Sequence, residues 1–166
     1  MSKMMNRAFA GALFAAAALS AGAANAAPVT ASATARANIL QQITVTNTSD
    51  LDFGTIVSGA AASTVAISTA GARTCGAGLT CTGTTTAANF NITGTNNAVV
   101  TITGDNSVTL SNGTTTMTAS LVRSSAGGAL SATGTGSVTV GGTLSLAANQ
   151  ADGVYTGTFN VSVDYQ

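Results

Sequence analysis

Residues 154–165 read VYTGTFNVSVDY, the clearest strand pattern in the chain. From Tyr155 onward, the larger side chains alternate with short polar ones. One face carries Tyr155, Gly157, Phe159, Val161, Val163 and Tyr165, and the other carries Thr156, Thr158, Asn160, Ser162 and Asp164. A strand that is buried on one face needs this period of two. We predict a strand over residues 154–165 with its aromatic and valine face against a core. The simplest interpretation is a core strand that happens to be the last one.

The same pattern recurs along the chain, with turn residues about every ten positions. Predicted strands cover 42–46, 51–57, 63–68, 88–93, 99–103, 115–123, 137–140 and 143–147, besides 154–165. Turn-forming stretches such as Ser111-Asn112-Gly113 and Gly141-Gly142 separate them. Good helix formers are scarce, which argues against helices. A disordered chain would carry more charge and fewer β-branched residues. We therefore predict a two-layer antiparallel β-sandwich with a thin core.

Residues 1–26 have the pattern of an export signal. Lys3 and Arg7 precede an apolar run of Ala, Leu, Phe and Gly, and Ala24-Asn25-Ala26 matches the small residues of a signal peptidase site. The run is too short to span a bilayer of about 30 Å as a helix. We predict a signal peptide over 1–26 and export to the periplasm or beyond, with a membrane anchor as the alternative.

Residues 27–41, which we call the arm, form a separate N-terminal extension before a domain over 42–166. The arm alternates the apolar residues Val29, Ala31, Ala33, Ala35, Ala37 and Ile39 with Thr, Ser, Arg and Asn. The eleven residues 29–39 would extend about 36 Å at roughly 3.3 Å per residue, which is longer than a typical strand. The arm could fold back as an edge strand of its own subunit. It could equally add a strand to a neighbouring subunit.

The charge inventory disfavours catalysis. Charged residues make up 6 % of the chain, which contains no His. After residue 26 there are three Arg and five Asp but no Lys or Glu, so general bases are scarce. Asp50 and Asp52 are predicted to lie in a solvated turn, and Gly104-Asp105-Asn106 has too few carboxylates for calcium. We predict no enzyme activity, no metal site, no cofactor and no nucleic-acid partner.

Cys75 and Cys81 are the only two cysteines. They are predicted to form a structural disulfide in an oxidising compartment and to pin a loop tip. The alternative of a redox or metal pair lacks the Cys-x-x-Cys spacing.

Four motifs carry a family resemblance: LDFGTIV (51–57), ANFNITG (88–94), VGGTL (140–144) and DGVYTGTF (152–159). Together they resemble a bacterial family of uncharacterised pilin-like surface proteins. That family is similar in turn to spore-coat-U type and archaic chaperone–usher fimbrial subunits. The resemblance covers nearly the whole chain after residue 26. It implies an immunoglobulin-like sandwich that lacks its final strand.

The resemblance also implies an assembly pathway. A periplasmic chaperone would first fill the open groove beside the C-terminal strand. At an outer-membrane usher, the arm of the next identical subunit would replace it, giving a fimbria on the cell surface. The donor side chains would be Val29, Ala31, Ala33, Ala35, Ala37 and Ile39. The acceptor side would be Tyr155, Phe159, Val161, Val163 and Tyr165. The alternative function is a self-complemented, monomeric secreted sandwich that binds a ligand or surface through its loops.

Overall fold

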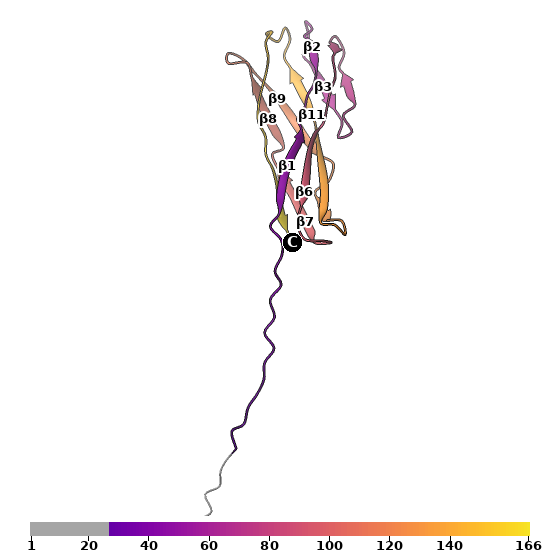
Figure 1. Ribbon diagram of the computed structural model, residues 1–166. Helices are drawn as coiled ribbons and strands as arrows, with labels where there is room; N and C mark the ends of the chain where they lie inside the picture. Colours follow the sequence, from indigo (N-terminus) through magenta and orange to yellow (C-terminus); the bar gives the residue numbers. More distant parts are fainter. Residues whose placement is uncertain (1–26) are drawn as a thin grey trace, which may run out of the picture. The chain divides into compact units, whose positions relative to one another are not determined.

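The computed structural model describes residues 27–166, so the predicted signal peptide over 1–26 lies outside the described residues. The chain divides into two units at Ala37/Asn38, and each is described by itself. Residues 27–37 form no strand, and all their side chains are exposed. Residues Asn38–Gln166, which we call the body, contain twelve strands, and no helix occurs in the described range (Figure 1). Among these residues there is accordingly no helix long and apolar enough to cross a membrane.

Short strands make up most of the body. They are β1 (Thr44–Ser49), β2 (Thr55–Val57), β3 (Ser63–Ile67), β4 (Arg73–Cys75), β5 (Thr80–Thr82), β6 (Ala88–Thr93), β7 (Val99–Gly104), β8 (Ser107–Ser111), β9 (Thr116–Arg123), β10 (Gly127–Ala129), β11 (Thr135–Leu146) and β12 (Val161–Tyr165). All the pairings are antiparallel, and the sheets form a curled half-barrel. The prediction of an all-β antiparallel fold is confirmed.

Strand β11 is the centre of the largest sheet (Figure 1). Its first half pairs with β6, its second half pairs with β3, and β9 pairs along its other side, followed by β8. Strand β1 pairs with β6 at one end of this sheet. A second sheet has the order β10-β7-β12, and β2 pairs with β5 in a third. Strands β7 and β8 do not pair with each other, so Gly104-Asp105-Asn106 joins two consecutive strands rather than closing a hairpin.

The prediction of a turn at Gly141-Gly142 is wrong, because β11 runs through both glycines. A Cβ at Gly141 would meet the backbone of Ile67 and Ser68, and one at Gly142 would meet the Ser120 carbonyl oxygen at 2.8 Å. Glycine inside a strand often marks such a close approach of neighbouring backbones. The two glycines therefore admit β3 and β9 against β11 instead of reversing the chain.

The core consists of two apolar clusters. We call them the lower and the upper cluster. The lower cluster contains residues of β6, β7 and β11, together with Leu130. The upper cluster contains residues of β3, β8, β9 and β11, together with Phe53. Val65, Ala119 and Val138 are fully buried, and Phe53 and Phe90 are the aromatic residues of the buried set. Leu51 and Phe159 pack against both clusters and link them. The core is therefore built mainly of aliphatic side chains.

Candidate functional site

The C-terminal strand β12 has one paired and one unpaired edge. It pairs antiparallel with β7, from Val161 opposite Gly104 to Tyr165 opposite Val100. The phase of the ladder is fixed at its ends, where the Gln166 amide donates to the Val99 carbonyl and the Asp105 amide donates to the Asn160 carbonyl, both at 3.0 Å. Because hydrogen-bonded pairs alternate in an antiparallel ladder, the even-numbered residues 160–166 face β7.

The odd-numbered residues of β12 therefore present their backbone groups to the other edge. These residues are Val161, Val163 and Tyr165, and no strand of the described chain pairs with that edge. An unpaired row of amide and carbonyl groups is a template for another strand. The first element of the candidate site is thus a free strand edge.

The side chains on the same odd-numbered positions point toward the core. Phe159, Val161, Val163 and Tyr165 are half-buried and pack against the lower cluster, whereas the residues between them are exposed. The Phe159 ring meets Phe90 edge-on, with the ring centroids 6.1 Å apart. The alternation predicted for this stretch is therefore present from Phe159 to Tyr165. Half-burial means that the apolar face of the strand is covered on one side only.

We call the half-buried apolar surface beside β12, formed by Phe159, Val161, Val163 and Tyr165, the apolar strip. On its other side lie β1 and the residues before it. Ile43 and Val45 are half-buried against the same lower cluster, and β1 pairs only with β6. Tyr165 links the two borders at their lower end. Its hydroxyl donates to the Gln41 carbonyl and accepts from the Thr95 amide, both at 2.7 Å. Strands β1 and β12 therefore flank one core as two free sheet edges.

The prediction of one continuous strand over 154–165 is only partly correct, because the strand begins at Val161. Farther up, Thr156 makes an isolated antiparallel bridge with Ser111 of β8. Between the two pairings, the Asp105 carboxylate accepts from the Asn160 amide at 2.7 Å. At the junction between β7 and β8, the Asp105 carboxylate therefore takes the place of a backbone carbonyl as the acceptor for this amide. The C-terminal segment still runs antiparallel along β8 and then β7.

Tyr155 lies apart from the other four predicted acceptor residues. Its hydroxyl accepts from the Gln150 side-chain amide and donates to the Ala151 carbonyl, both at 2.9 Å. These bonds, together with one between its hydroxyl and the Thr115 hydroxyl, hold the side chain at this end of the body. The structure therefore places Phe159, Val161, Val163 and Tyr165 together on the lower core and puts Tyr155 at the upper end, beside a cavity.

This cavity has a volume of about 630 Å³. Residues 51–58 and 150–155 form its two walls, and Leu110, Met117, Leu144 and Leu146 are the apolar residues of the strands that line it. Leu51 lines the cavity and also packs against both core clusters. The cavity is therefore next to the upper end of the apolar strip. Sequence reasoning missed it, since it depends on how residues far apart in the chain are brought together.

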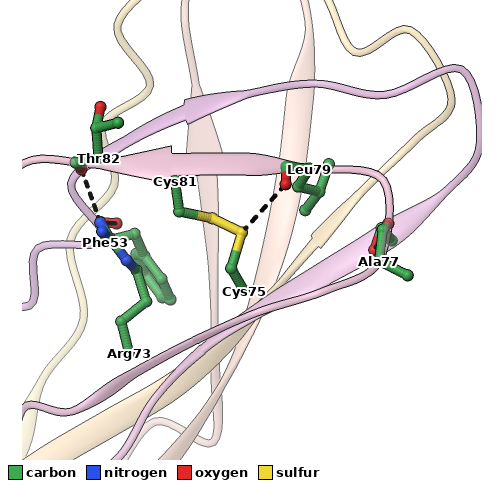
Figure 2. The surroundings of a disulfide bond; sticks show 8 residues. Phe53, Arg73, Cys75, Ala77, Leu79, Cys81 and Thr82 are labelled. Carbon is green, nitrogen blue, oxygen red and sulfur yellow. Dashed lines mark hydrogen bonds between the residues drawn. A yellow bond between two sulfur atoms is a disulfide. The ribbon is translucent and has the colours of Figure 1, made fainter.

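The predicted disulfide between Cys75 and Cys81 is present (Figure 2). It supports one wall of the cavity. It joins β4 to β5, and β5 pairs with β2, whose residues line the cavity. Arg73 adds a second tie, because its guanidinium donates to the Thr82 carbonyl at 2.7 Å and to the Phe53 carbonyl at 3.3 Å. The disulfide thus joins two strands rather than only pinning a loop tip.

The predicted donor residues are all exposed. Val29, Ala31, Ala33, Ala35 and Ala37 lie in the unit that contains no strand, with Val29 98 % exposed. Ile39 lies at the start of the body and is 89 % exposed. Apolar side chains with this exposure contribute no burial energy to the fold, so they are free for another contact.

Asp50 and Asp52 serve local structure. Asp50 accepts from the Asn47 side-chain amide at 2.7 Å, and Asp52 accepts from the Gly54 amide at 2.8 Å. Short-range bonds of this kind are typical of turns. In the described residues there is no group of three or more His, Cys, Asp or Glu side chains that could hold a metal ion.

Comparison with known proteins gives one family. A domain of unknown function, DUF4402, matches residues 43–165, which is about three quarters of the chain and includes every strand. No curated protein and no solved structure matches the chain.

Proposed function

We propose that this chain, which belongs to the DUF4402 family, is a structural subunit of a bacterial surface fimbria that polymerises by donor-strand exchange. The observation that carries the proposal is the free edge of β12, with the half-buried apolar face beside it. The body is then an immunoglobulin-like sandwich that lacks one strand between β12 and β1. The arm of an identical subunit supplies this strand.

The chemistry of the arm suits this role. Its eleven alternating residues 29–39 equal in number the residues 155–165 of the C-terminal segment. Strand addition of this kind gains affinity from main-chain hydrogen bonds and specificity from alternate side chains. Four of the six apolar arm residues are alanine, which fits a shallow strip already partly filled by Val161 and Val163. A free alanine-rich arm buries too little area to order on its own.

The same features favour assembly with the help of a chaperone. An unpaired strand edge beside exposed apolar surface is an aggregation hazard, and this chain has few charges to oppose it. A periplasmic chaperone that covers the edge until an outer-membrane usher replaces it with an arm removes that hazard. Export through the periplasm, guided by residues 1–26, belongs to the same proposal. Once a donor strand is held by continuous backbone bonds, its release is slow and the fibre is kinetically stable.

Deleting residues 27–39 tests the proposal against its alternative, a self-complemented monomer. We expect the truncated chain to form no fibres on the cell surface in electron micrographs. We also expect a synthetic peptide of residues 27–41 to raise its thermal stability. A full chain that stays monodisperse at high concentration, together with a truncated chain that unfolds and is not rescued by the peptide, would refute the fimbrial role.

A further inference from the structure

We propose that the 630 Å³ cavity receives Ile39 from the arm of a second copy, with that arm antiparallel to residues 155–165. This inference rests on the fimbrial function proposed above. It adds which end of the arm occupies which end of the strip. It therefore gives the order of subunits along the fibre.

Each subunit releases its own arm at the Tyr165 end of the apolar strip. Gln41 is held at the lower end of the strip, because its carbonyl accepts from the Tyr165 hydroxyl and its amide donates to the Thr95 hydroxyl at 2.7 Å. The cavity is at the other end, lined by residues 150–155. Ten residues of extended chain separate Tyr155 from Tyr165, or about 33 Å at roughly 3.3 Å per residue.

A head-to-tail contact that repeats along a fibre allows only one direction of the donated arm along residues 155–165. Ile39 is two residues from Gln41, so it must stay close to the body that donates the arm. If Ile39 lay at the Tyr165 end, the donor body would occupy the space where the acceptor releases its own arm. With Ile39 in the cavity, the donor body and the departing arm lie at opposite ends, so the contact can repeat without closing.

The sizes of the arm side chains favour the same direction. Val29 and Ile39 are the only arm residues larger than alanine on the apolar face, and Ile39 is the larger. The lower part of the strip is already lined by the half-buried side chains of Val161 and Val163. The cavity instead offers open space beside Met117 and Leu144. A large apolar side chain gains more by entering such a space than by lying on a shallow surface.

The cavity and the apolar strip share one continuous apolar surface. Leu51 lines the cavity and packs against the lower cluster, and Val161 and Val163 pack against the same cluster. Phe159 packs against both clusters from the C-terminal segment. One extended strand can therefore run from the cavity to Tyr165 without leaving apolar surface.

Paired cysteine variants of the full chain test this register. The first variant carries Asn38→Cys with Val154→Cys, and the second carries Thr30→Cys with Val154→Cys. Asn38 and Thr30 are exposed neighbours of Ile39 and Val29 on the polar face of the arm, so every apolar arm side chain is kept. Val154, at the cavity wall, is 83 % exposed, so none of these changes touches the buried core. Assembled fibres are treated with a short bismaleimide and run on a denaturing gel. The native cysteines are paired and do not react.

We expect a ladder of covalent multimers from the first variant and a single-subunit band from the second. The reverse pattern, equal ladders, or fibres without a ladder from either variant would overturn the register while leaving the fimbrial function intact. Absence of fibres from the unmodified chain would instead reject the proposed function, and the register with it.

Discussion

Replacing Ile39 with alanine changes the arm without touching a strand or either core cluster. The side chain is 89 % exposed in the unassembled chain, so its loss leaves the stability of the body unchanged. If it becomes buried in the cavity, the substitution removes three carbons at about 0.8 kcal/mol each, or about 2.4 kcal/mol at full burial. At about 1.4 kcal/mol per factor of ten, the arm should bind roughly 50-fold more weakly.

A competition assay measures this loss. Synthetic peptides covering residues 27–41 are added to the full chain, and light scattering records the concentration that halves the rate of fibre growth. The peptide with Ile39→Ala should need roughly 50 times the concentration of the unmodified peptide, within a factor of a few. The matched control is Val29→Ala, which should have a smaller effect because Val29 is placed on the shallow end of the strip.

Two results would contradict burial of Ile39 in the cavity. Equal potency of the Ile39→Ala and unmodified peptides would show that the cavity is not the site of Ile39. A full-chain Ile39→Ala variant whose unpolymerised form melts several degrees lower would show that Ile39 packs against its own body.

Other substitutions test the fold around the site by thermal or denaturant unfolding. Replacing both Cys75 and Cys81 with serine should lower the free energy of unfolding by roughly 2–3 kcal/mol through the loss of a short closed loop, and an unchanged midpoint would contradict a bracing role. Tyr165→Phe removes the bonds to Gln41 and Thr95 and should cost about 1–2 kcal/mol; no loss would mean that these bonds do not close the lower end of the strip. Gly157→Val places a side chain against the Thr109 carbonyl and should cost about 1–3 kcal/mol, whereas a neutral result would deny the close packing of this segment on β8.

Local alternation was enough to predict most of the fold. Strand β6 has the bounds predicted for it, and β3, β7 and β9 differ from their predictions by one residue at one end. These strands combine β-branched residues with burial on one face, so sequence and packing agree. The three-residue strands β4, β5 and β10 and the five-residue strand β8 were not predicted. Each exists through its pairing with another segment: β4 with β3, β5 with β2, β8 with β9 and β10 with β7.

Two errors have a common physical origin. Gly141-Gly142 suggested a turn, and residues 154–160 suggested a strand, yet the first lies within β11 and the second lies before β12 begins. In both places the outcome depends on which backbone lies next to the segment. A glycine pair permits either a reversal or a close approach, and local sequence does not distinguish them. The cavity beside Tyr155 escaped prediction for the same reason.

Hydrogen exchange at individual amides of residues 161–166 shows whether the outer edge of β12 is free in the single subunit and paired in the fibre. The amides of Ser162, Asp164 and Gln166 face β7, and those of Val161, Val163 and Tyr165 face the free edge. In the unpolymerised chain we predict slow exchange for the first set and fast exchange for the second. In the fibre, both sets should exchange slowly, because an arm pairs with the free edge. Protection of Val161, Val163 and Tyr165 in a monodisperse chain, or fast exchange of these amides in the fibre, would contradict the account.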